Sequence, residues 1–200
     1  VHIIHLLNSL IDDNWHVDAP YWSTSVTPFH PGFSLILAYE GSTLAASVVY
    51  RTLSINDRKC IYRAATVVAR AYQELGLYGV FRKLIVEHER ELCALASEIY
   101  YSWRTRNPIL WASNARFCRR VVPNLLDDSS SDPELEQSCL LAAEKLFPSV
   151  PVEQPHMIMK NVYAMTYRAE PVIRENSPVN RRFKELLSNR RDSIFSLGVI

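Results

Sequence analysis

The chain has 200 residues, so it can bury about 70% of its extended-chain surface without help from disulfides. Hydrophobic residues make up 48% of it and charged residues 22%, a balance that excludes disorder of the whole chain. The 22 basic and 21 acidic residues give a net charge of +1, which provides no global field for binding nucleic acid or an anionic membrane.

The N-terminal part combines a helical pattern with an irregular one. Residues 2–11 carry apolar side chains at helical spacing, which predicts a short amphipathic helix. Residues 12–32 contain three prolines and four aromatic residues without any regular period, which predicts a long aromatic loop. Loops of this kind often line binding sites.

Strand-forming residues dominate the next segment. Residues 34–40 and 43–50 are separated by a Gly-Ser pair, which predicts a β-hairpin whose second strand extends to Ile55. Residues 56–58 turn the chain into a third run of strand character at 60–69. We therefore predict three successive antiparallel strands.

The apolar period then changes from 2 to 3.6 residues. This change predicts a helix over residues 76–95. Strand character returns at 99–103, and residues 106–108 interrupt it. A second helix is predicted at 109–118, with a proline in its first turn.

The segment after residue 125 is the least regular. The acidic stretch 127–132 predicts a surface insertion, and Ser131 with Glu134 resembles a capping box that begins a helix ending at Leu146. We expect this insertion to cover about residues 125–155.

The last part of the chain is predicted to contain two strands and a short helix. The strands are expected at 157–167 and 194–200, with the helix near 180–187 between them. No composition shift marks a domain boundary, so we expect residues 1–200 to form one α+β domain with a mixed sheet.

One motif resembles a known family. Gln73, Gly76 and the helix after them are similar to the Gln/Arg-x-x-Gly-x-Gly/Ala signature of the GCN5-related N-acetyltransferase superfamily, although Tyr78 stands at the final Gly/Ala position and Gly79 comes one residue late. The order of predicted elements around the motif is similar as well. The resemblance implies a mostly antiparallel mixed sheet of six to seven strands with a V-shaped splay, flanked by helices, and a first strand that would precede Val1.

The resemblance also implies a function. It is that of an acyl-CoA-dependent N-acyltransferase, in which a small-molecule amine attacks the thioester of acetyl-CoA or a longer acyl-CoA directly. Two alternatives stay open: an acyltransferase whose donor partner is an acyl carrier protein, and a non-catalytic protein that binds or senses acyl-CoA. We expect a monomer or a homodimer.

A helix N-terminus presents unpaired N–H groups, and glycine lets a pyrophosphate approach them closely. In the family, the end of the fourth strand pairs with the pantetheine arm of the cofactor. A phenol at the last motif position could crowd the pyrophosphate or stack beside it. The cofactor-binding residues that we expect are Val67, Val68, Gln73, Gly76, Leu77, Tyr78, Gly79, Val80 and Asn107.

Acid–base groups are harder to identify, because the family's usual Glu and Tyr are not plainly present. Three tyrosines are candidates, with structural burial or a water-mediated base as alternatives: Tyr62, Tyr100 and Tyr101. The aromatic loop would bind the acceptor, with packing onto the sheet as the alternative. Its candidate residues are Trp15, Tyr21, Trp22, Phe29 and His30.

The cysteines, the hydropathy profile and the arginine-rich segment give no evidence of a metal site, a disulfide or a membrane span. The four cysteines have neither metal-ligand nor disulfide spacing, so we predict reduced, half-buried thiols and no metal site. No apolar run approaches the roughly 20 residues of a membrane span, and no signal peptide is evident, which favours a cytoplasmic location. Residues 104–120 contain five arginines and no acid, which indicates either a positive patch or a solvated helix face.

Overall fold

The computed structural model describes residues 2–17, 19–23, 28–92, 98–127, 132–163, 166–168 and 177–200. Within these ranges the chain forms five α-helices, one 3-10 helix and ten strands, several of them only two residues long. The mixed α+β class predicted from the sequence is confirmed.

The chain divides into two compact units. Unit 1 consists of Val1–Thr52, Arg63–Ser97 and Tyr167–Ala169. Unit 2 consists of Leu53–Tyr62, Glu98–Thr166 and Glu170–Ile200. The single domain expected from the sequence, and the splay expected after the fourth strand of the family fold, stay predictions.

The sheet of unit 1 is the predicted meander. Strands β2 (Phe33–Glu40), β3 (Thr43–Ile55) and β4 (Arg58–Val68) are neighbours in that order. The β2–β3 pair is antiparallel and closes at Gly41, whose φ of 58° is the left-handed conformation that such a hairpin turn requires. The three-strand prediction is therefore confirmed.

The second hairpin turn belongs to unit 2, together with Leu53–Ile55 of β3 and Arg58–Tyr62 of β4. Asn56 and Asp57 both adopt positive φ, at 48° and 60°. Two consecutive left-handed residues make a turn whose twist matches the flanking strands, and Asn and Asp tolerate this conformation well. The predicted turn after Ile55 is confirmed.

Helix α1 (His2–Asn14) is longer than predicted, and Trp15–His16 forms the short strand β1 next to Tyr167 of β9 (Thr166–Tyr167). The prediction of a loop from residue 12 is therefore wrong for residues 12–16. Long-range contacts hold this segment: the Asn14 carbonyl accepts a hydrogen bond from the Arg168 amide, and the Trp15 ring lies 5.7 Å from the Tyr167 ring.

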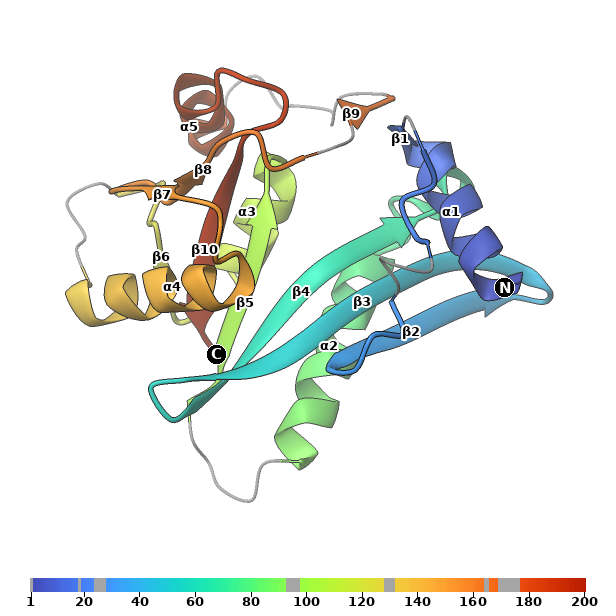
Figure 1. The fold of residues 1–200 in the computed structure, drawn as a ribbon, viewed down its shortest axis with the longest axis horizontal. Coiled ribbons are helices and arrows are strands. Elements are labelled where there is room, and N and C mark those ends of the chain that lie inside the picture. The colour runs from blue at the N-terminus through green and yellow to red at the C-terminus, as the bar shows by residue number, and fades with distance from the viewer. Residues whose placement is uncertain are drawn as a thin grey trace. The chain divides into compact units, whose positions relative to one another are not determined.

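The 3-10 helix η1 (Arg70–Tyr72) and helix α2 (Leu77–Glu91) follow β4 in unit 1. The buried face of α2 consists of Phe81, Ile85, Val86 and Glu89. Near its C-terminus, the Tyr50 hydroxyl of β3 donates to Glu89 Oε1 at 3.1 Å, so α2 packs on the sheet (Figure 1). The helix ends four residues before the predicted residue 95, which lies outside the described residues.

The centre of unit 2 is β10 (Ser193–Val199), all of whose residues are buried. It pairs antiparallel with β5 (Tyr100–Thr105) on one edge and with β6 (Arg120–Val122) and β8 (Ile158–Met159) on the other. Strand β7 (Val152–Glu153) pairs with β8.

The predicted strand at 157–167 is wrong. Only β8 near its start and β9 at its end are strands, and residues 164–165 lie outside the described residues. Met157 and Asn161 have φ values of 54° and 53°, in the left-handed region, which interrupts an extended strand on both sides of β8. The apolar residues in 157–167 therefore indicate burial and do not form one continuous strand.

The described residues of unit 2 form three helices, α3 (Pro108–Ala115), α4 (Pro133–Leu146) and α5 (Pro178–Leu186). Asp132 caps α4, because its side chain accepts from the Leu135 amide at 3.2 Å. The capping box predicted at Ser131 falls on a residue outside the described ones, and the observed N-cap is the next residue.

Helix α4 lies within the insertion expected at about residues 125–155, and that insertion stays a prediction. This helix packs on β10 and buries a row of mostly small residues. They are Leu135, Ser138, Cys139, Ala142 and Ala143. Because of these buried residues, the helix belongs to the core of unit 2. The acidic residues before the helix dominate the composition of this segment, which is why the sequence did not indicate its apolar face.

Two cysteines are fully buried in unit 2. Burial raises the pKa of the Cys60 thiol to about 12 and also raises that of Cys139. Cys118 is half-buried, and Cys93 lies outside the described residues. The prediction of half-buried thiols thus holds for Cys118, whereas Cys60 and Cys139 are more deeply buried than expected.

This burial predicts an alkaline loss of stability. The thiols of Cys60 and Cys139 stay protonated in the folded state at pH values where they ionise in the unfolded chain, because their folded pKa values are the higher ones. We expect the contribution of the two thiols to the free energy of unfolding to be constant below pH 8 and to fall as the pH rises from about 9 towards 12. Urea denaturation of wild type and of the Cys60→Ala/Cys139→Ala variant at pH 7 to 10 measures this contribution. If the free energy of unfolding falls equally with pH in both proteins, the expectation is contradicted.

Candidate functional site: the start of helix α2

The turn of residues 73–80, the candidate anion-binding turn, joins β4 and η1 to helix α2 in unit 1. Gly76 is the N-cap residue of α2, with a φ of 77° and no side-chain hydrogen bond to the helix. Its carbonyl accepts from the amides of Gly79 at 2.9 Å and Val80 at 3.2 Å. The first turn of α2 contains no acidic residue. The positive end of the helix dipole therefore lacks the carboxylate that often neutralises it in proteins.

The backbone of this turn is open to a ligand. A Cβ atom placed on Gly76 or on Gly79 would meet no described atom within 4 Å. The φ of Gly76 also favours glycine, because most other residues adopt the left-handed conformation only at an energetic cost. A phosphate group can approach a turn with this combination of space and N–H donors, so the residues present fit a pyrophosphate.

Tyr78 is directed to the strand β4. The guanidinium of Arg63 lies over its ring, 3.4 Å from the centroid, and the Arg63 residue is only 6% exposed. An Arg–aromatic stack of this kind contributes about 2 kcal/mol when it is shielded from water. The position of the ring is therefore set by Arg63, a partner that the motif itself does not contain.

A hydrogen-bonded clamp joins the end of α1 to the same turn. Asn14 Nδ2 and Gln73 Nε2 both donate to the Val68 carbonyl, at 3.1 and 3.2 Å, and Gln73 Nε2 also donates to Asn14 Oδ1 at 2.7 Å. Beside them, Asp13 Oδ2 accepts from the Arg70 amide at 2.8 Å. The side chain of Gln73 therefore braces the turn from within, and the Val68 carbonyl already has two donors.

Asn14→Ala tests this clamp. The variant removes a donor to Val68 and the acceptor of Gln73, and we expect a loss of about 1–2 kcal/mol in the free energy of unfolding. A double-mutant cycle with Gln73→Ala, measured by urea denaturation, should give a coupling energy of about 0.5–1 kcal/mol. Additive effects would show that the two side chains act independently.

The five predicted acceptor-binding residues all belong to unit 1. The backbone of Trp22 is held by Asn8, through two hydrogen bonds of 2.8 Å, and Tyr21 packs edge-on against the Trp22 ring at 4.8 Å. Phe29 is 52% exposed, and the neighbouring His30 is exposed as well. Trp15 packs against Tyr167. The structure therefore brings Tyr21 and Trp22 together and presents Phe29 and His30 to solvent, whereas residues 24–27 lie outside the described residues.

The three candidate tyrosines are buried in unit 2, none of them more than 5% exposed. Tyr62 packs against Phe147 and Phe195, and Tyr101 packs against Trp103 and Phe117. Their role in proton transfer stays a prediction.

The predicted Asn107 has a local role. Its Oδ1 accepts from the amides of Ile109 and Leu110, at 2.9 and 3.3 Å, and so caps helix α3 in unit 2. An Asn-Pro pair at this position is typical of a helix start, because proline is favoured as the first helical residue. Cofactor contact by Asn107 stays a prediction.

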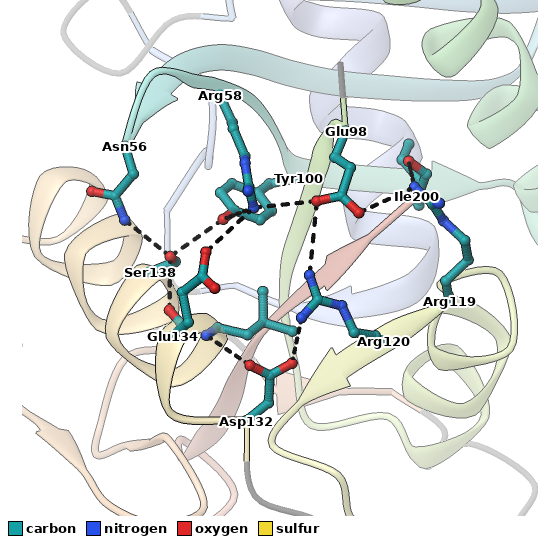
Figure 2. Close-up of polar contacts among 11 residues, drawn as sticks. Asn56, Arg58, Glu98, Tyr100, Arg119, Arg120, Asp132, Glu134, Ser138 and Ile200 are labelled. Atoms are coloured by element: carbon teal, nitrogen blue, oxygen red, sulfur yellow. Dashed lines mark hydrogen bonds and ion pairs between the residues drawn. The ribbon is translucent and has the colours of Figure 1, made fainter. Parts of the chain in front are cut away.

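Tyr100 belongs to a network of charges in unit 2 (Figure 2). Its hydroxyl accepts from Arg58 Nη1 at 2.8 Å, and this hydrogen bond raises the pKa of the Arg58 guanidinium. Arg58 and Arg120 both pair with Glu98, with closest N–O distances of 3.3 and 3.8 Å (Figure 2). Arg120 also pairs with Asp132 at 2.8 Å.

This network contains two of the five arginines of the basic segment 104–120. Arg119 and Arg120, at its end, pair with Glu98, so they are neither a bare positive patch nor simply solvated (Figure 2). Arg104, at its start, lies over the rings of Phe147 and Tyr163. Glu98 and Asp132, the acids that pair with Arg119 and Arg120, lie outside the segment, so the local sequence could not reveal these pairs.

None of the described helices is long and apolar enough to cross a membrane. No group of three or more His, Cys, Asp and Glu side chains in the described ranges is arranged to hold a metal ion.

Solved structures that resemble this chain include two acetyltransferases. The ribosomal-protein-S18-alanine N-acetyltransferase from Escherichia coli is 16% identical, with a TM-score of 0.46, over 100% of this chain and 89% of that one. The IAA acetyltransferase from Bacillus cereus ATCC 14579 is 10% identical, with a TM-score of 0.42, over 92% of this chain and 87% of that one. No protein-family model matches the sequence, and no curated protein matches it significantly. Both TM-scores lie below 0.5, so the function is inferred from the geometry of this chain.

Proposed function

We propose that this chain is an acyl-CoA-dependent N-acyltransferase of the GCN5-related type, whose anion-binding turn holds the pyrophosphate of the donor. One observation carries the proposal: Gly76 begins α2 in the left-handed conformation, with no side-chain cap, no acid in the first turn and open space at Gly76 and Gly79. Backbone N–H groups at such a helix start are suited to a phosphate ligand.

The residues of the turn would bind and orient the donor. The first-turn backbone from Leu77 to Val80 would face the phosphates, which would share the Gly79 and Val80 amides with the Gly76 carbonyl, while the Asn14 clamp fixes the end of β4 against the turn. The bound thioester would supply the activated acyl group. Because Asn14 and Gln73 occupy the Val68 carbonyl, contacts to the pantetheine arm would use other backbone atoms near Val67 and Val68.

The proposed acceptor is a small amine that binds at the aromatic residues of unit 1. The exposed Phe29 ring supports this assignment, because an exposed aromatic side chain offers an apolar surface next to its exposed neighbour His30. The burial of the three candidate tyrosines favours a water-mediated base over direct contact between a phenol and the amine.

Thermal denaturation with coenzyme A, acetyl-CoA and a long-chain acyl-CoA tests the donor. A ligand at about 100 times its Kd stabilises the folded protein by about 2.7 kcal/mol, which raises Tm by about 5–10 °C for a chain of this length. We expect a clear shift with at least one of them. No shift with any of the three would overturn the proposal and favour an acyl carrier protein as donor.

A second candidate is a protein that binds acyl-CoA without catalysis. The observation in its favour is the burial of Tyr62, Tyr100 and Tyr101, the three candidate acid–base residues. A shift in Tm with acyl-CoA, combined with no transfer to any amine in a broad panel, would support this function. Acyl transfer to an amine would exclude it.

A further inference from the structure

We propose that Arg63 and Tyr78 are positioning residues for the anion-binding turn: the guanidinium stacked on the ring ties the first turn of α2 to β4 and fixes the direction of its N–H groups. The inference rests on the proposed function and deepens it, because it concerns the same turn. It assigns a role to the residue at which this chain departs from the family signature.

The first turn of α2 has neither a capping side chain nor an acidic residue, the two features that commonly stabilise a helix start. Gly76 provides no capping side chain, and no acidic residue stands in the turn to interact with the dipole. Without another attachment the first turn would fray, and its N–H groups would lose their common direction. Tyr78 is the second residue of the helix, so its contact with Arg63 ties the first turn itself to β4.

Arg63 is suited to this role because it is itself held in place. It belongs to β4, it is 6% exposed, and its planar guanidinium covers the ring face at 3.4 Å. A strand residue offers a more rigid anchor than a loop residue would. The order that Arg63 imposes on Tyr78 therefore extends directly to the backbone of the turn.

The opposite end of α2 has its own polar attachment to the sheet. There the Tyr50 hydroxyl donates to Glu89 Oε1 at 3.1 Å, with both residues buried. Glu89 lies 11 residues after Tyr78 in sequence, about 16 Å along a helix. Two polar contacts thus hold the two ends of one helix, and only the Arg63–Tyr78 contact lies at the proposed ligand site.

Isothermal titration of coenzyme A into matched variants tests the inference. Tyr78→Leu and Arg63→Met remove the stack, and each is expected to raise the Kd at least tenfold. The double variant should bind no more weakly than the weaker single variant, because both substitutions remove the same contact. Tyr78→Phe keeps the aromatic face and should stay within twofold of wild type.

Two control variants separate positioning from general stability. Arg51→Met removes another Arg–aromatic stack in unit 1, over Phe33 at 5.4 Å, and Tyr50→Phe removes the distal attachment of α2. Both should leave the Kd of coenzyme A within twofold, even where Tm falls. Hydrogen exchange without ligand should be faster at residues 77–80 in Tyr78→Leu than in either control.

The outcomes discriminate between the two proposals. Wild-type affinity in Tyr78→Leu, or an equal loss of affinity in the controls, would overturn the positioning role while the proposed function stands. If the leucine variant does not fold, Arg63→Lys serves in its place, because lysine keeps the charge but loses the planar stack; an unchanged Kd and unchanged exchange would then overturn the role. A wild-type protein that does not bind coenzyme A would overturn the proposed function and this inference with it.

Discussion

Gly79→Asp is expected to lower the affinity for coenzyme A at least 100-fold while the protein stays folded. The new carboxylate would enter the open space next to Gly79, in the first turn of α2. It would repel the pyrophosphate and compete for the same N–H groups. An acidic residue in the first turn is favourable for the helix itself, so Tm without ligand should not fall.

Isothermal titration and thermal denaturation of the same samples measure the two effects. Gly79→Ala is the matched control, because alanine replaces glycine in the helix without adding charge and should raise helix stability by up to about 1 kcal/mol. We expect the alanine variant to lose less than tenfold in affinity. Equal affinities of wild type and Gly79→Asp would place the ligand elsewhere.

Gly198→Ala is expected to destabilise the protein by about 3 kcal/mol and to lower Tm by about 6–12 °C. Gly198 lies in β10 between Tyr101 of β5 and Val121 of β6. A Cβ atom there would overlap Cys118 Sγ, and it would lie 2.7 Å from Cys118 Cβ and 3.0 Å from the Arg120 carbonyl oxygen. The strands on both sides leave β10 little room to move.

Cys118→Gly in the Gly198→Ala background should restore part of the lost Tm, because it removes the two closest contacts. The Arg120 carbonyl stays, so recovery should be incomplete. Thermal denaturation of the three variants completes the comparison. An unchanged Tm for Gly198→Ala alone would contradict the tight packing of Gly198 against Cys118.

Local patterns predicted most of the elements that carry the candidate site. Three elements could be predicted from the sequence because turn residues and apolar periods act over a few neighbouring positions: the β2–β3 hairpin, the Asn56–Asp57 turn and helix α2. Gly76 was found through the resemblance of Gln73 and Gly76 to a family signature, and its observed left-handed φ is one that glycine adopts readily. The location of the turn therefore followed from the sequence.

The partners of the turn could not be predicted in this way. Asn14 reaches the Val68 carbonyl across 54 residues, and Arg63 meets Tyr78 only because α2 folds back onto β4. No local pattern encodes such pairs. The core position of α4 had a weak signal, since Cys139, Ala142 and Ala143 share one helical face, but the acidic residues before the helix outweighed it.

The pairing of β10 also bears on how the protein avoids self-association. All seven residues of this apolar strand are buried, and such a strand with an uncovered edge is a template for intermolecular β-sheet. Two short strands cover one edge, β8 at residues 193–194 and β6 at 197–199, while the Phe195 amide donates to the Met157 carbonyl between them. These short strands cover the edge of β10. Substitutions that disrupt β6 or β8 should therefore cause aggregation before they affect ligand binding.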